Sequence, residues 1–191
     1  TILHDFSATH QHQAIGQPGL FLAGEITGFA LVRTAVTHGT QVARAVHARL
    51  ATDPSQLAGE IPDLLVIGLG PAGLSCMLAA KELGMRAVGV DQAEEVGGTV
   101  AAYPRRKMVM TQPMHLPLHG KLKRLEYTKE QLVELWQELA REHQLDVSLG
   151  APVDRIERTE GGAFSVVVGG RPLHAKNVCL AVGRRGTPRR L

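Results

Sequence analysis

A short apolar run followed at once by three spaced glycines constrains this chain more than any other feature. The run is Leu64 to Ile67, and Gly68-x-Gly70-x-x-Gly73 comes directly after it. Such a run is typical of a strand that a parallel sheet buries on both faces. The first glycine permits a sharp turn, the second lets the backbone approach a pyrophosphate, and the third lets a new helix pack close to the strand. The sequence therefore predicts a strand, a tight turn and a helix N-terminus that bind a dinucleotide.

The segment after the glycines extends this pattern. Pro71, followed by Ala72, stands at the start of the expected helix, where a missing N–H costs nothing. A second strand is expected over Arg86 to Val90, and Asp91 and Gln92 follow it. An acid at about this distance hydrogen-bonds ribose hydroxyls and repels a 2′-phosphate, which favours FAD or NAD over NADP at this site. The alternative is an unrelated α/β protein in which Asp91 only caps a strand.

Composition excludes several classes of protein. Of the 191 residues, 44% are hydrophobic and 20% charged, which is ordinary for a globular protein. The formal net charge is +3, and we interpret the basic clusters at 105–107, 121–124 and 184–190 as solvated faces, not as a nucleic-acid site. No apolar run is long enough to span a bilayer, and no signal-peptide pattern is present.

The two cysteines indicate a reducing compartment. Cys76 and Cys179 are far apart in sequence, each lies in an apolar segment, and no Cys-x-x-Cys is present. We therefore expect buried thiols in a cytoplasmic protein without a dithiol pair of that type.

The first fifty residues predict a strand and a long helix. Residues 18–28 are expected to form a short strand that runs into Gly24-Glu25, and apolar residues at spacings of three and four then predict a helix over 29–50. Gly39 inside this helix would allow a close approach. Residues 51–62, with two prolines, are expected to be a linker.

His10-x-His12 has no cysteine or carboxylate partner at a suitable spacing, so no metal site is predicted.

The second half predicts another helix and a group of strands. Thr128 and Gln131 form a capping-box pattern at the start of the helix. The expected buried face of that helix holds Leu132, Leu135, Trp136 and Leu139. Strands are expected over 106–111, 146–149, 153–158, 163–168 and 177–182, with glycine turns at 160–162 and 169–170. The last of these strands is expected to lie beside 64–67.

Residues 63–191 resemble the FAD-binding half of flavoproteins with two dinucleotide-binding domains, in the thioredoxin-reductase-like class. Gly97-Gly98-Thr99, Tyr103-Pro104 and the stretch 180–188 are most similar to bacterial putative thioredoxin or bacillithiol-disulfide reductases. The resemblance implies an α/β, Rossmann-like FAD-binding domain with a parallel sheet, helices and a small antiparallel β-meander.

The resemblance also implies a cofactor site. The glycine fingerprint would hold the FAD pyrophosphate, Asp91 the adenosine ribose, and the backbone near Val153 the adenine, while 97–99 would lie along the flavin and 181–183 would close over the cofactor. The implied cofactor-binding residues are Gly24, Glu25, Gly68, Gly70, Pro71, Ala72, Gly73, Asp91, Gln92, Gly97, Gly98, Thr99, Val153, Ala181, Val182 and Gly183. No catalytic residue is implied.

Residues 19–25 resemble the C-terminal end of the same family, where a final strand and an acid hold the flavin ribityl and pyrophosphate. The family usually has Asp where Glu25 stands. The modules therefore come in reversed order, with residues 1–50 as a C-terminal-type flavin-binding segment before the domain at 63–191. Two explanations are open, namely a fragment cut from tandem modules and a circular permutant. The family's second domain, which binds NADPH, has no counterpart among the residues.

These expectations lead to a functional hypothesis. The chain would be the FAD-binding part of an NAD(P)H-dependent flavoprotein oxidoreductase of the disulfide-reductase type, with a small-molecule or protein electron acceptor and compatible with a homodimer. NADPH would bind the parent enzyme at a site outside this chain. The alternatives are an NAD-dependent dehydrogenase domain and a non-catalytic nucleotide-binding module that acts as a sensor or in docking.

Overall fold

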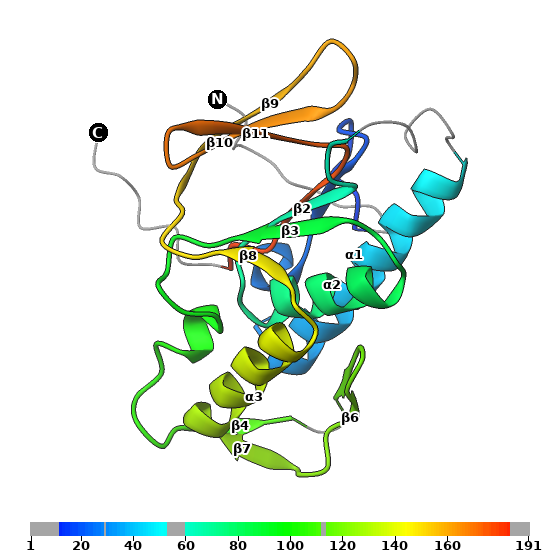
Figure 1. Cartoon of the computed structure of the whole chain (residues 1–191). Coiled ribbons are helices and arrows are strands. Elements are labelled where there is room, and N and C mark those ends of the chain that lie inside the picture. The colour runs from blue at the N-terminus through cyan, green and yellow to red at the C-terminus, as the bar shows by residue number, and fades with distance from the viewer. Residues whose placement is uncertain (1–11, 29, 53–59, 112–113, 184–191) are drawn as a thin grey trace.

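The computed structural model describes residues 12–28, 30–52, 60–111 and 114–183. His10, most of the expected linker and the basic cluster at 184–190 lie outside the described residues. The described part of the chain forms three layers, with a small antiparallel sheet, a parallel sheet and helices stacked in that order (Figure 1). These layers confirm the expected fold class.

A parallel sheet of five strands forms the middle layer. Its strand order is β1-β12-β2-β3-β8, and every neighbouring pair is parallel. The strands are β1 Leu20–Leu22, β12 Val178–Leu180, β2 Leu64–Ile67, β3 Ala87–Val90 and β8 Asp146–Ser148. The apolar run at β2 lies at the centre of the sheet, and all four of its residues are buried. The expected strand at 177–182 does lie beside β2.

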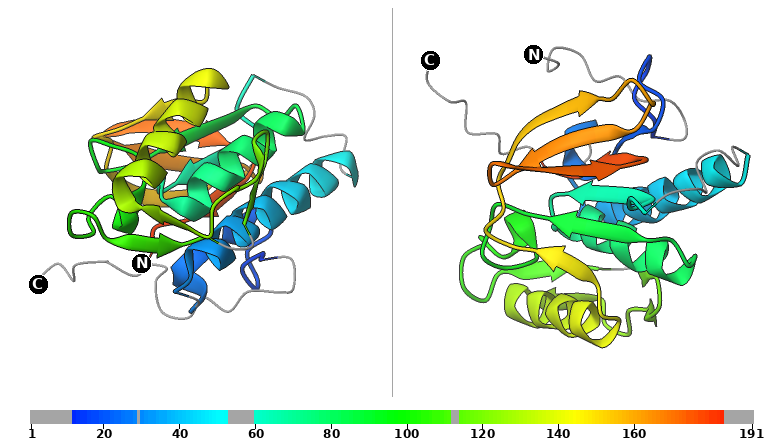
Figure 2. Two further views of the ribbon diagram at one scale, coloured as in Figure 1. Left: turned by 90° about the horizontal axis from the view of Figure 1, so that it is seen from below. Right: turned by 45° about the horizontal axis from the view of Figure 1, so that its top comes forward.

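Three helices cover one face of this sheet (Figure 2). They are α1 Val32–Thr52, α2 Pro71–Glu82 and α3 Lys129–Glu142. The helix α3 begins with the predicted capping box, in which the Thr128 side chain accepts from the N–H of Gln131 and the Gln131 side chain accepts from the N–H of Thr128. Trp136 is buried in the core between α3 and the rest of the molecule. Leu132 and Leu139 are buried with it, and Leu135 is half-buried.

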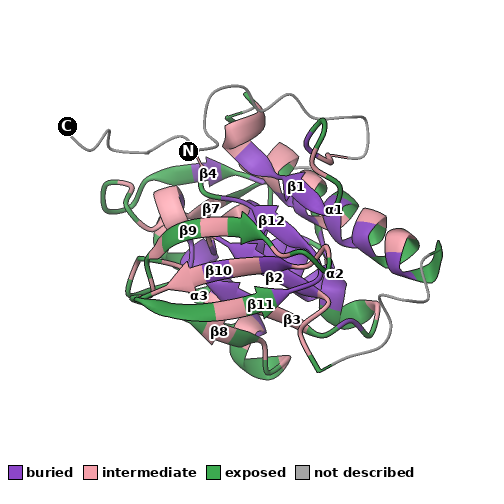
Figure 3. Cartoon of the chain, turned by 90° about the horizontal axis from the view of Figure 1, so that it is seen from above, coloured by how far each residue is buried: buried purple, intermediate pink, exposed green. Residues whose placement is uncertain are grey.

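The antiparallel sheet covers the opposite face of the parallel sheet. It consists of β9 Val153–Arg158, β10 Phe164–Val168 and β11 Arg171–Ala175, with β10 in the middle. Phe164 and Val166 of β10 pack with Leu65 and Val178 in a second hydrophobic cluster. Seen from above, the sheet beneath is buried while the outer side of β9 and β11 is exposed (Figure 3). This layer is the expected β-meander.

Two small strand pairs lie outside the two larger sheets. One joins β4 Met108–Met110 to β7 Glu126–Thr128, and the other joins β5 His115–Leu116 to β6 Gly120–Lys121. The strand expected over 106–111 is confirmed as β4, whereas β5, β6 and β7 were not predicted.

The first strand of the chain lies beside the last strand of the sheet. Leu20, Phe21 and Leu22 pair with Val178, Cys179 and Leu180. The helix α1 also packs along α2 in one core cluster. The described parts of 20–52 and 64–180 therefore pack together as one unit. Both explanations of the reversed order of the modules, a fragment of tandem modules and a circular permutant, stay open.

The segment between β1 and α1 differs from expectation. The strand ends at Leu22, and the Gly24-Glu25 pair into which it was expected to run lies in a 3-10 helix, η1 Gly24–Thr27. Gly24 has φ +79°, a left-handed conformation that takes the chain out of the extended path after Leu22. The long helix then begins at Val32, later than expected. In the described part of the chain, no helix combines the length and apolar character that a bilayer crossing needs.

Candidate functional site

A cavity of about 430 Å³ opens at the carboxyl ends of the parallel strands. The loops after β1, β2, β3 and β12 contribute to its wall, together with the starts of α1 and α2. Open α/β sheets bind ligands at this edge, where the strand order reverses. Here the reversal falls between β2 and β12, because the chain runs from β2 through β3 to β8 on one side and then returns to β12 on the other side of β2.

Two of the three fingerprint glycines have the structural roles that the sequence predicted. Gly68 has φ +97°, and a Cβ on it would lie 2.5 Å from the carbonyl oxygen of Ala181. Gly73 packs so closely that a Cβ would overlap the carbonyl oxygen of Gly68 and lie 3.2 Å from Cγ1 of Val66. These glycines set the sharp turn after β2 and the close packing of α2 on the strand.

Gly70 is different, because nothing in the described part of the chain requires glycine there. Its φ of −75° and ψ of −169° are extended angles that any residue adopts. The nearest heavy atoms to a Cβ would be the Cα of Gly98 at 3.7 Å and the carbonyl oxygen of Gly97 at 3.9 Å, which is ordinary contact. Gly70 lines the cavity, so a Cβ on it would take up space at the mouth of α2 that a ligand could otherwise use.

The N-terminus of α2 faces this space without a side-chain cap. Gly70 is the N-cap residue and has no side chain to hydrogen-bond the first turn, and Pro71 follows it. The first N–H groups of a helix lack partners within the helix and carry its positive dipole end. The arrangement suits an anionic group, in particular a phosphate.

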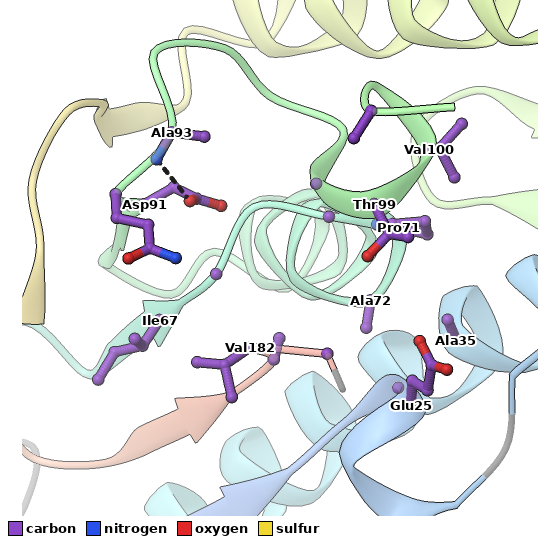
Figure 4. Close-up of a pocket in the computed structure, with 18 of the residues that line it drawn as sticks. Glu25, Ala35, Ile67, Pro71, Ala72, Asp91, Ala93, Thr99, Val100 and Val182 are labelled. Carbon is purple, nitrogen blue, oxygen red and sulfur yellow. Dashed lines mark hydrogen bonds between the residues drawn. The ribbon is translucent and has the colours of Figure 1, made fainter. Parts of the chain in front are cut away.

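Asp91 is held by the backbone at the end of β3. Its Oδ2 accepts from the N–H of Leu69 at 2.6 Å, and its Oδ1 accepts from the N–H of Ala93 at 2.9 Å. A carboxylate has about four acceptor positions, so each oxygen retains capacity for a ligand hydroxyl. Figure 4 shows the Asp91–Ala93 hydrogen bond at one end of the cavity.

Glu25 lies at the other end of the cavity (Figure 4). It follows Gly24, whose φ is positive and on which a Cβ would stand 2.9 Å from the Cβ of Ala72. This close approach brings η1 to the start of α2. The wall at this end also contains Thr99.

The structure brings most of the expected cofactor-binding residues to one cavity. The members that line it are Gly24, Glu25, Gly68, Gly70, Pro71, Ala72, Asp91, Gln92, Gly98, Thr99, Val153, Ala181, Val182 and Gly183. Gly73 and Gly97 do not line it. Gly97 packs against α3, where a Cβ would lie 3.2 Å from Cγ2 of Val133, and its N–H donates to the carbonyl of Leu69 at 2.8 Å. Both glycines therefore pack against segments that form the wall and do not face the cavity themselves.

Eleven residues that line the cavity, most of them apolar, were not among the expected cofactor-binding residues. The additional lining residues are Ala30, Leu31, Val32, Ala35, Ile67, Val90, Ala93, Val100, Ala102, Tyr103 and Ala151. Four of them, Ile67, Val90, Ala93 and Val100, adjoin an expected cofactor-binding residue, and Tyr103 belongs to the Tyr103-Pro104 pair that carries the family resemblance.

The structure resembles solved flavoenzymes over part of their length. Bacillithiol disulfide reductase from Staphylococcus aureus matches with a TM-score of 0.57 and 17% identity, over 66% of this chain and 39% of that one. A flavin-containing monooxygenase from Stenotrophomonas maltophilia matches with a TM-score of 0.57 and 21% identity, over 65% and 39%. OTEMO in complex with FAD and NADP matches with a TM-score of 0.53 and 15% identity, over 66% and 26%. The chain thus spans about two fifths of the first two proteins, and these likenesses show the fold.

No curated protein matches the chain in sequence. A family model described as pyridine nucleotide-disulphide oxidoreductase, however, matches residues 65–191, which is more than half of the chain. This match confirms the resemblance drawn from the glycine fingerprint and the 97–104 segment. The chain belongs to the pyridine nucleotide-disulphide oxidoreductase family.

Proposed function

We propose that this chain is the FAD-binding part of an NAD(P)H-dependent flavoprotein oxidoreductase. The observation that carries the proposal is Gly70, a glycine that its own backbone angles and neighbours do not require and that lines the cavity at an uncapped helix N-terminus. The family match and the fold shared with OTEMO, which binds FAD and NADP, support it.

The two ends of the cavity would bind different parts of FAD. The N–H groups at the start of α2 would hold the pyrophosphate beside Gly70. Asp91 would accept hydrogen bonds from the adenosine ribose, with Gln92 and Val153 beside the adenine. Glu25 at the far end would then lie at the ribityl and flavin side.

FAD supplies the redox chemistry in such enzymes, by taking a hydride from NAD(P)H and passing two electrons to an acceptor. The residues of this chain position it and shape its surroundings. The start of α1 contributes Val32 and Ala35 to the wall, so the positive end of the α1 dipole favours negative charge at that end of the cavity. Leu31 and Val182 line the same cavity with apolar surface.

We further propose that the reaction resembles that of a disulfide reductase. The structural likeness to bacillithiol disulfide reductase supports it, although a monooxygenase matches with the same TM-score. The sequence has no Cys-x-x-Cys, so electrons would leave without a relay of that type. A low-molecular-weight disulfide, a quinone or a redox centre of another protein would fit as acceptor.

The test is the visible absorbance spectrum of the purified chain before and after incubation with FAD and desalting. We expect flavin bands that persist, and titration of FAD fluorescence then gives a Kd. Gly70→Ala should raise that Kd at least about tenfold, because the added Cβ occupies the place of the phosphate. Gly161→Ala is the matched control, because Gly161 has no positive φ and a Cβ on it would have no neighbour closer than 4.0 Å.

Three outcomes would contradict the proposal. The first is a protein that binds NAD but never holds FAD, which would favour the dehydrogenase alternative. The second is a protein that binds neither nucleotide. The third is an unchanged FAD affinity in a folded Gly70→Ala variant, as judged by its thermal unfolding midpoint. If FAD stays bound but the flavin is not reduced by NAD(P)H when the chain is part of its complete enzyme, the sensor or docking alternative replaces the catalytic part of the proposal.

A further inference from the structure

The strand β4 exposes two methionines on one side of a two-stranded sheet. Met108 is 50% exposed and Met110 is 77% exposed, whereas Val109 between them is only 6% exposed. Side chains alternate along a strand, so the two methionines share the face that points away from the core. No described element covers them. Methionine is a soft, flexible side chain that is enriched in protein interfaces.

Cations lie at both ends of this strand pair. Arg105, Arg106 and Lys107 precede β4, and Lys123 and Arg124 precede β7. All five are exposed, and because β4 and β7 run antiparallel, the two groups lie at opposite ends of the pair. We call Met108, Met110 and these five cations the basic methionine face. Residues 105–130 carry seven cations and two acids, a net charge of +5 that exceeds the +3 of the whole chain.

This face is attached directly to the wall of the cavity. Tyr103 lines the cavity, and Met108 follows it by five residues, a span of at most about 18 Å. Two contacts of Lys129 connect the strand pair to the wall segment. Its N–H donates to the carbonyl of Lys107 at 2.9 Å, and its Nζ donates to the carbonyl of Ala101 at 2.8 Å. A partner on the face would therefore sit near the part of the cavity wall that contains Tyr103.

The chemistry of the face favours an acidic protein as its partner. Exposed cations around a small apolar centre are typical of protein interfaces that steer an oppositely charged partner. An anionic membrane is a poorer match, because the exposed residues of the strand pair include no Trp or Tyr of the kind that anchor proteins at a lipid interface. Glu126 also lies opposite Met110 in the register, where insertion into lipid would bury a carboxylate.

We propose that the basic methionine face is the docking surface for an acidic electron-transfer protein that serves as the electron acceptor. The proposal rests on the proposed function, because it names the class of acceptor, but docking itself does not require bound FAD. The positive charges would steer the partner, and Met108 and Met110 would pack in the centre of the contact.

The probe is an acidic plant-type [2Fe–2S] ferredoxin, whose binding to the FAD-incubated chain is followed by isothermal titration calorimetry at low and at high ionic strength. We expect binding that weakens steeply with salt. The double variant Lys107→Gln/Arg124→Gln should lower the affinity about tenfold at low salt. The control Arg171→Gln removes an exposed charge from β11, on the antiparallel sheet, and should leave the affinity unchanged.

Two further variants test the charge and the packing separately. Glu126→Gln removes the acid beside Met110 and should strengthen binding, which a variant that merely disturbs folding would not do. Met110→Ser should weaken binding at every salt concentration, because its effect is not electrostatic. None of these residues lines the cavity, so the Kd for FAD should stay the same in all of them.

The outcomes separate this proposal from the proposed function. No binding at low salt, or binding that the double variant and Arg171→Gln weaken equally, would overturn it while leaving FAD binding untouched. Binding to vesicles of phosphatidylserine and phosphatidylcholine without binding to ferredoxin would assign the face to a membrane. A dimer that Met110→Ser dissociates, measured by light scattering, would assign it to a second copy of the chain. Failure to bind FAD with ferredoxin binding intact would contradict the proposed function alone.

Discussion

Gly39 of α1 lies against the backbone of Ala72 at the start of α2. A Cβ on Gly39 would overlap the carbonyl oxygen of Ala72 and would stand 2.9 Å from the backbone N of Cys76. Ala72 lines the cavity, so this glycine sets how closely the helix from the first fifty residues approaches the proposed phosphate site.

Gly39→Ala should therefore destabilise the protein even though alanine is the better helix former. The gain in helix propensity is about 1 kcal/mol, and the overlap with backbone atoms should outweigh it and lower the free energy of unfolding by about 1–3 kcal/mol. FAD binding should weaken as well, because α2 would have to shift. Thr37→Ala, at an exposed position of α1, is the control and should be neutral or slightly stabilising. Urea denaturation gives the free energy of unfolding of both variants. Equal stability of Gly39→Ala and Thr37→Ala would contradict the close packing of Gly39 on Ala72.

Asp91→Asn should weaken both the loop and the site. The carboxylate accepts N–H groups from Leu69 and Ala93 with different oxygens, and an amide has only one oxygen to offer. Leaving one N–H without an acceptor costs about 1–3 kcal/mol. We expect the Kd for FAD to rise at least about tenfold, while Asp154→Asn on the exposed side of β9 changes nothing. Titration by flavin fluorescence measures both, and an unchanged Kd in Asp91→Asn would remove Asp91 from the proposed site.

From the lowered pKa of Asp63 we expect the protein to lose stability in acid. Burial raises the pKa of its carboxyl, but the hydrogen bond from Lys176 Nζ at 2.7 Å, the N–H of Arg86 and the two nearby charges outweigh burial and hold the pKa below its usual value. A carboxyl with a lowered pKa in the folded state stabilises the fold above its unfolded-state pKa, and this stability is lost as the pH falls through the folded value. The free energy of unfolding should thus decline below about pH 4.

The matching variant is Asp63→Asn. Lys176 is almost fully buried, so removing its partner charge should cost about 3 kcal/mol at neutral pH. The variant should also show a shallower decline in acid than the unsubstituted protein. If the free energy of unfolding declines with falling pH equally steeply in Asp63→Asn and in the unsubstituted protein, other carboxyls dominate the acid transition.

Cys76 and Cys179 should resist thiol reagents in the folded protein. Both are fully buried, and the neighbouring Cys179 thiol together with burial raises the pKa of the Cys76 thiol well above its usual value. Since only the thiolate reacts, modification by a disulfide reagent should be slow in buffer and rapid in urea, where unfolding exposes both thiols to the reagent. Rapid reaction of either thiol in buffer would contradict the burial of the pair.

The residues that fix local geometry were the predictable part of this molecule. The strand at Leu64–Ile67, the turn at Gly68, the close packing at Gly73 and the capping box at Thr128 depend on neighbours in sequence, and all are confirmed. The strands β5, β6 and β7, which were not predicted, have only two or three residues each, too few for a period-two pattern. Packing against the rest of the fold decides whether they form.

Relationships across long sequence separations were the unpredictable part. Cys76 and Cys179 read as two separate buried thiols because no local pattern connects α2 to β12, which come together only in the sheet and its helix layer. A strand that runs into Gly24-Glu25 was predicted, but the 3-10 helix that these residues form was not, because the positive φ of Gly24 accompanies its close approach to Ala72. The motif glycines were correctly singled out, but whether each faces the cavity or packs behind its wall, as Gly97 does, depends on α3.

The pairing of β1 with β12 has a consequence for synthesis of the protein on the ribosome. Leu20 and its partner Val178 are 158 residues apart, so at about 5–20 residues per second β1 emerges roughly 8–30 s before the strand that hydrogen-bonds it. During that interval α1 can dock on α2, whose residues are made earlier than β12, while the edge of β1 that later pairs with β12 has no partner. The nascent chain thus exposes the unpaired edge of β1, at which other chains could associate with it. Rapid docking of α1 on α2 would limit this association.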